Sequence, residues 1–131
     1  MGDIIRLECN ECGKSYDLNI GRGMADNSLD RVLGHFDEST SDLIRSKLSV
    51  IDKEDYWGYR RMIGRCGSCG TFAAIPVFVI NGDGKEYLTA QKCECGASYE
   101  IYDDDDDARM KEIRCPKCNG TMSALYTGMW D

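Results

Sequence analysis

The sequence is short of several features that define large classes of protein. It has one histidine and two prolines, and no apolar run approaches the roughly 18 residues that a membrane-spanning helix needs. The longest apolar stretch, residues 72–80, contains a proline. The first residues lack the basic segment and apolar run of a signal peptide. We therefore expect a cytoplasmic protein that makes no membrane contact.

Recognisable catalytic motifs are also missing. The chain has no phosphate-binding glycine loop, no nucleophile motif and no carboxylate pair tied to other reactive groups. A general acid–base role for the only histidine, His35, would need partners that nothing in the sequence points to. We expect that the protein is not an enzyme and that His35 is an ordinary helix residue.

Positive charge is outnumbered, with 16 basic against 23 acidic residues and a net charge of −7. Such a molecule repels a nucleic-acid backbone on average. In one stretch, residues 56–65, aromatic residues are followed by arginines. This stretch could bind nucleic acid by base stacking and phosphate contact despite the negative net charge. The candidate contacts to nucleic acid or another partner are Trp57, Tyr59, Arg60, Arg61 and Arg65. The simpler interpretation is a strand whose aromatics pack inward and whose arginines are solvated or offset nearby acids.

Cysteine, by contrast, is abundant, and its eight residues form four close pairs with none left over. In a cytosolic chain, pairs at this spacing indicate metal sites, because two thiolates so close in sequence can face one ion. Zn²⁺ binds four such ligands in a tetrahedron at about 2.3 Å. The four pairs therefore predict two zinc ions, with iron as the less favoured metal.

The residue after each pair sharpens this prediction. Gly13, Gly70 and Gly96 directly follow three pairs, and Asn119 follows the fourth. Glycine and asparagine adopt the positive φ that a loop needs when it folds over a metal. These segments resemble the knuckles of the zinc-ribbon and rubredoxin-like group, with motifs C-x-x-C-G and C-P-x-C-G. The resemblance implies metal sites on small β-structures and says little about function.

An internal repeat suggests which pairs share a metal. Residues 12–18 (CGKSYDL) match residues 95–101 (CGASYEI), and residues 63–72 resemble residues 113–122. Such a repeat predicts two tandem copies of one ribbon. The predicted sites are Cys9, Cys12, Cys66 and Cys69 in the first copy, and Cys93, Cys95, Cys115 and Cys118 in the second. Nested or cross-braced pairing is the alternative, because Cys69 and Cys93 are close enough in sequence to share a ribbon.

The predicted fold is a small metal-stabilised α+β protein, consisting of two tandem zinc ribbons of short antiparallel strands with a helical insertion in the first. Residues 1–72 form the first ribbon, with its helical insert at 26–55. Residues 73–92 form a connecting β-hairpin, and residues 93–131 form the second ribbon. Because small ribbons have little core, zinc is expected to supply much of the folding free energy.

Within the insert, apolar residues recur at helical spacing and predict two helices. Their apolar positions are Leu29, Val32, Leu33 and Phe36 in the first helix, and Leu43, Ile44, Leu48 and Ile51 in the second. Each pattern is most simply a stripe that faces the core, and a groove for a partner helix is the alternative.

Five consecutive aspartates, residues 103–107, raise the question of a calcium loop. An EF-hand would need Gly at position 108 and Glu at position 114, where this chain has Ala108 and Arg114. We expect the run to be the exposed tip of a short hairpin with arms at 98–102 and 109–115. A hook for a basic partner is the alternative.

Closed four-cysteine sites are structural, because they leave no coordination position open. The expected function is therefore that of a non-enzymatic zinc-binding adaptor or regulator that contacts a protein partner. One alternative is a nucleic-acid-binding ribbon. The other is a thiol and zinc redox switch, because Cys93, Cys95, Cys115 and Cys118 resemble the zinc switch of the redox-regulated heat-shock chaperone.

Overall fold

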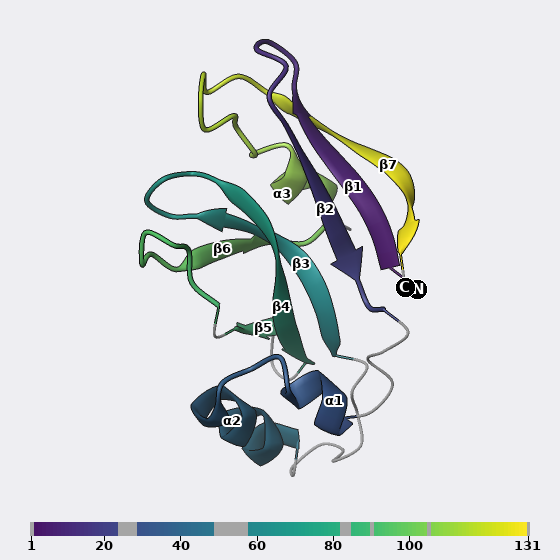
Figure 1. Cartoon of the computed structure of the whole chain (residues 1–131), viewed down its shortest axis with the longest axis vertical. Coiled ribbons are helices and arrows are strands. Elements are labelled where there is room, and N and C mark those ends of the chain that lie inside the picture. The colour runs from purple at the N-terminus through teal and green to yellow at the C-terminus, as the bar shows by residue number, and fades with distance from the viewer. Residues whose placement is uncertain are drawn as a thin grey trace.

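The fold is known from a computed structural model that describes residues 2–23, 29–48, 58–81, 85–89, 91–104 and 106–130. Side chains of Leu29, Leu48, Asn81 and Lys85 are outside this description. The elements in chain order are β1 (Gly2–Cys9), β2 (Ser15–Gly21), α1 (Leu29–Leu33), α2 (Glu38–Leu48), β3 (Tyr59–Cys66), β4 (Phe72–Asn81), β5 (Lys85–Leu88), β6 (Tyr99–Tyr102), α3 (Asp107–Met110) and β7 (Met122–Trp130) (Figure 1).

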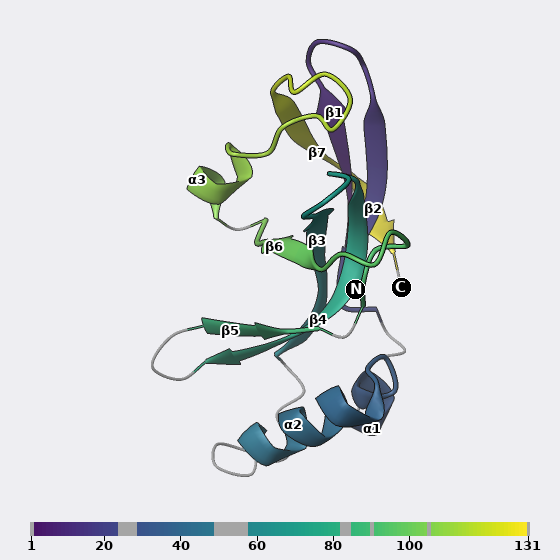
Figure 2. The same ribbon diagram turned by 90° about the vertical axis from the view of Figure 1, so that its left-hand side faces the viewer.

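All strand pairs in the described ranges are antiparallel and fall into two groups. In the first group, β1 lies between β2 and β7. In the second group, β4 lies between β5 and β3, and β6 pairs with the other edge of β3. A single residue pair, Gly21 with Arg61, joins β2 to β3. The two groups diverge from this junction, and α3 lies beside β6 and the far ends of β1 and β7 (Figures 1 and 2).

The main core is shared by the two strand groups. Alternating apolar residues of β1 and β2 contact residues of β3, β4 and β6, as expected for strands with one buried face. The cluster consists of Ile5, Leu7, Leu18, Ile20, Ile63, Phe72, Tyr102 and Ile113. Because both groups contribute to it, the chain does not build its core ribbon by ribbon in sequence order.

The predicted ribbon boundaries do not follow the strand pairing. Strand β7, from the range 93–131, pairs with β1 from the range 1–72. Strand β6, also from 93–131, pairs with β3 from 1–72. The group of β3, β4 and β6 is thus inserted in the chain between the two halves of the group of β1, β2 and β7.

The helical insert packs against the far end of β3 and β4. Val32, Leu33 and Ile44 are buried against a cluster that contains Tyr59 and Phe78, which confirms the core-facing stripe at these positions. Leu43 differs from the prediction, because 45% of its surface is exposed. Ile51 lies outside the described residues. In the described part of the chain, neither the length nor the apolar character of any helix is enough to cross a membrane.

The hairpin predicted between the two ribbons is present. Strands β4 and β5 pair from Phe78 with Leu88 to Asn81 with Lys85. The turn residues 82–84 lie outside the described residues.

The hairpin predicted around the aspartates is wrong. Strand β6 pairs with β3 instead of with residues 109–115, and α3 comes after it in the chain. The short segment after the aspartates forms a capped helical turn.

The aspartates between β6 and α3 make different contacts. Asp103 is 9% exposed and its carboxylate lies 2.8 Å from the Arg60 guanidinium. The Tyr126 hydroxyl donates to Asp104 at 3.2 Å. Asp106 caps α3 by accepting a hydrogen bond from the Arg109 N–H. The predicted exposure of the run is therefore found at Asp106 and Asp107 but not at Asp103, and neither Asp106 nor Asp107 lies at the tip of a hairpin.

Candidate metal centres

Each cysteine pair lies in the same kind of backbone loop. The N–H of the first cysteine donates to a carbonyl beyond the loop, and the residue after the second cysteine donates back to the carbonyl of the first, with distances of 2.8–3.2 Å. That residue has the predicted positive φ, with 76° at Gly13, 76° at Gly70, 89° at Gly96 and 61° at Asn119. The local sequence therefore specifies the loop in all four places.

The eight cysteines gather into two groups of four. Centre A consists of Cys9, Cys12, Cys115 and Cys118, and centre B consists of Cys66, Cys69, Cys93 and Cys95. Within each centre all Sγ atoms lie within 4.8 Å of one another. The predicted tandem pairing is wrong, and the structure has the nested arrangement in which centre B lies between the two halves of centre A in sequence.

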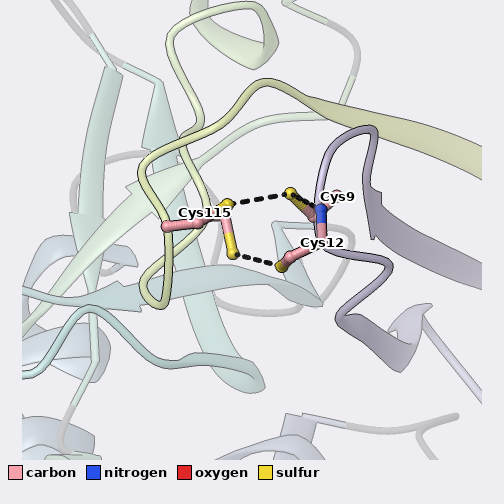
Figure 3. A group of neighbouring side chains, drawn as sticks. Cys9, Cys12 and Cys115 are labelled. Atoms are coloured by element: carbon pink, nitrogen blue, oxygen red, sulfur yellow. Dashed lines mark hydrogen bonds between the residues drawn. The ribbon is translucent and has the colours of Figure 1, made fainter.

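Strand register explains this pairing. In centre A, Cys9 is paired with Met122 across β1 and β7, so the β1–β2 turn faces the segment that precedes β7 (Figure 3). In centre B, Cys66 is paired with Tyr99 across β3 and β6. Each centre thus joins a hairpin turn to the segment that enters a third strand. The sequence repeat identifies loops of similar structure. In each repeated pair, one loop forms a hairpin turn and the other precedes a third strand. The repeat therefore does not identify which cysteine pairs share a centre.

The sulfur geometry fits a tetrahedral metal ion. Facing Sγ atoms are 3.4 Å apart between Cys9 and Cys118 and 3.6 Å apart between Cys12 and Cys115. The matching distances in centre B are 3.4 Å and 3.6 Å. Zn–S bonds of about 2.3 Å require sulfur separations of ~3.8 Å, whereas a disulfide would need about 2.05 Å. Both centres could therefore hold a metal ion with four sulfur ligands.

The first cysteine of each pair is buried and the second is exposed. Backbone N–H groups of Cys12 and Glu11 point at the Cys9 sulfur and lower the pKa of Cys9 to about 6. The N–H groups of Cys69 and Ser68 likewise lower the pKa of Cys66 to about 6. Because a thiolate is the metal-binding form, each centre holds at least one ligand in that form near neutral pH.

Two of the exposed partners, Cys69 and Cys118, behave in the opposite way. The N–H of Thr71 lowers the pKa of Cys69, but the thiols of Cys66 and Cys93 outweigh it and raise the pKa to about 11. The N–H of Gly120 is likewise outweighed at Cys118, whose pKa is raised to about 12 by Cys9 and by burial. Negative charge already present on one sulfur disfavours a second, so a cation is needed to hold four thiolates together.

Comparison of the chain with protein-family models, with curated proteins and with solved structures found no match in any of the three. The function is therefore inferred from the geometry of the chain itself.

The aromatic and arginine residues proposed for nucleic acid are largely engaged inside the fold. Tyr59 is 1% exposed, and its ring stacks on that of His35 at 5.2 Å. Arg60 is paired with Asp103. Trp57 lies outside the described residues. Tyr59 therefore has no surface with which a base could stack.

Arg61 and Arg65 project from the face of β3 opposite to that of Arg60, since side chains alternate along a strand. The Arg61 guanidinium lies over the Trp130 ring at 5.6 Å. Arg65 lines a polar cavity of about 460 Å³ between residues 66–70 of centre B and residues 115–119 of centre A. The sequence placed the arginines in one run but did not show that Arg65 lies between the two centres.

Proposed function

We propose that the protein is a non-enzymatic zinc protein, in which two structural zinc ions hold the strand groups in place for contact with a protein partner. The observation that carries this proposal is the gathering of eight cysteines into two compact groups of four. Four thiolates fill a tetrahedral shell and leave no position for water or substrate, which is typical of structural zinc.

The role proposed for zinc is based on where the centres lie. Centre A would tie the β1–β2 turn to the segment before β7, and centre B would tie the β3–β4 turn to the segment before β6. Both bridges connect parts that pack into the shared core. In a chain of 131 residues, metal binding of this kind is expected to be coupled to folding.

The redox-switch and nucleic-acid-binding functions are less well supported than the structural role. The redox-switch interpretation rested on Cys93 and Cys95 sharing a site with Cys115 and Cys118, but these pairs belong to different centres. The nucleic-acid interpretation rested on one aromatic and arginine surface, whereas Tyr59 is buried and Arg60 and Arg61 lie on opposite faces of β3. The acidic balance of the chain also opposes binding to phosphate.

Native mass spectrometry of the purified full chain tests the proposal. We expect a colourless protein that carries two zinc ions and shows no affinity for single-stranded or double-stranded nucleic acid at low salt. A red iron form that persists when cells are grown with excess zinc would point to electron transfer instead. Fewer than two bound metals would overturn the structural role of one centre.

A further inference from the structure

Strand β7 forms an edge of the sheet with no described strand on its outer side. Residues 122–130 contain no charged side chain, although 30% of the chain is charged. Edge strands are usually protected by charge, proline or a covering segment, because their free N–H and C=O groups can pair with another chain. Positions 124–129 of β7 are all exposed. This edge therefore lacks the common side-chain protection against strand addition.

Apolar surface is concentrated on the same strand. Tyr126 and Met129 are 61% and 66% exposed, and Leu125, on the face of β7 opposite to Ala124 and Tyr126, is 49% exposed. They are three of the five large hydrophobic residues that are exposed among those the structure describes. Exposed apolar groups gathered on one element mark an interaction surface more often than scattered ones do.

An apolar groove runs beside β7 on its inner face. Met122 and Ala124 of β7 line it together with Met110 and Ile113, and its volume is about 180 Å³. The pairing of β7 with β1 is regular from Met122 to Tyr126 and is interrupted beyond by a bulge opposite Ile4 and Ile5. A strand added along this regular part would place every second side chain on the side of the groove.

The charge around the groove selects the occupant. Asp107 lines the groove, and Asp104 accepts the hydrogen bond from the Tyr126 hydroxyl. Among the lining residues Asp107 is matched by one cation, Lys111, so the excess negative charge comes from Asp104 and from Asp106, which is exposed on the same connection. A second copy of this chain would bring the same aspartates to the same face and be repelled. A basic segment would instead be attracted.

We propose that β7 binds an extended segment of a partner protein, which adds as a strand along Met122–Tyr126. Its alternate apolar side chains enter the groove, and a lysine or arginine beside them faces Asp104 and Asp107. Main-chain hydrogen bonds supply affinity in this mode of recognition, and the groove and charges supply specificity. This inference rests on the proposed function, since it names the surface and the chemistry of the protein partner.

A phage library of random peptides of about 12 residues, selected against the zinc-loaded full chain, tests the inference. We expect the enriched peptides to share apolar residues at alternate positions with at least one lysine or arginine. Binding of the best peptide, measured by fluorescence anisotropy, should weaken as salt increases. Selection of peptides without this pattern, or no enrichment at all, would overturn the inference.

Two neighbouring substitutions locate the site. Ala124→Arg fills the groove and neutralises its acidic side, so binding should weaken by about tenfold or more. Leu125→Arg makes the same charge change at an exposed position on the opposite face, so binding should change by less than about threefold. Equal losses in the two variants, or a peptide-free dimer that Ala124→Arg dissociates, would contradict the inference. Zinc content of the same samples reports on the proposed function separately.

Discussion

Centres A and B are built from the same loops but close very different lengths of chain. Facing cysteines of centre B are 29 and 24 residues apart, whereas those of centre A are 109 and 103 residues apart. Local geometry is similar in the two centres, with corresponding backbone hydrogen bonds and a positive φ after each pair, although the Cys93–Cys95 loop of centre B is one residue shorter. The difference between them is therefore one of topology.

That difference has an energetic consequence. The shorter separation is 103 residues in centre A and 24 residues in centre B. When neither centre has formed, closing centre A therefore costs about 1.3 kcal/mol more chain entropy than closing centre B. Centre B can thus organise β3, β4 and β6 as a local unit, and centre A then fastens β7 to β1. The insertion of one strand group inside the other gives the centres different roles in assembly.

Removal of both metals should have the largest effect. Treatment with a strong chelator is expected to abolish cooperative thermal unfolding, because apparent binding energies of about 10 kcal/mol or more are typical of four-ligand zinc sites. Circular dichroism and calorimetry, with zinc added back as the control, measure this. A chelated protein that keeps its cooperative transition would show that the shared core is sufficient without metal.

Substitutions at two glycines in the loops of centre B test whether the loops of the two centres contact each other. In Gly96→Ala the added Cβ has no atom within 4 Å, so the only cost is that alanine must adopt a positive φ. The substitution should lower the free energy of unfolding by about 1 kcal/mol. Gly70→Ala also approaches the Pro116 Cβ in centre A to 3.1 Å and should cost about 2 kcal/mol or more. Chemical denaturation of the zinc-loaded variants compares them. Equal costs would mean that the two loops do not constrain one another.

Metal loading should depend on the closure lengths. Titration of the metal-free chain with Co²⁺ is expected to fill centre B before centre A, with an affinity difference of about ninefold if loop closure dominates. Variants Cys95→Ser and Cys118→Ser, each lacking one exposed ligand, assign the two spectral steps. Simultaneous filling, or filling of centre A first, would break the proposed order.

The smallest expected effect comes from the N-cap of α3, the short helix between Cys95 of centre B and Cys115 of centre A. Asp106→Ala removes the cap of α3 and should destabilise the protein by about 1 kcal/mol, whereas the control change Asp107→Asn leaves the cap in place and should cost less than about 0.5 kcal/mol. Since α3 precedes only the second half of centre A, zinc release from centre A should accelerate more than release from centre B. A uniform change at both centres would argue against a local role for α3.

The part of the fold that local chemistry decides could be predicted from the sequence. The loops over each cysteine pair depend on Gly13, Gly70, Gly96 and Asn119, which accept positive φ at little cost. The β4–β5 hairpin and the buried faces at Val32, Leu33 and Ile44 depend on turn residues and apolar spacing. In each case the sequence pattern that predicts the feature lies within a short stretch of the chain.

Partner choice between the loops could not be predicted in this way. Similar loops at Cys12 and Cys95 carry no information about which distant strand each will face. That choice depends on the register of β7 on β1 and of β6 on β3, which depends in turn on the shared core around Ile5, Leu7 and Tyr102. The burial of Asp103 against Arg60 was missed for the same reason, since the partner lies 43 residues away.

The nested pairing is tested most directly on the unmodified chain loaded with NMR-active cadmium. Through-bond coupling between each metal and the cysteine β-protons identifies the four ligands of each ion. We predict that one cadmium couples to Cys9, Cys12, Cys115 and Cys118 and the other to Cys66, Cys69, Cys93 and Cys95. Coupling of Cys9 and Cys66 to the same ion would contradict the account.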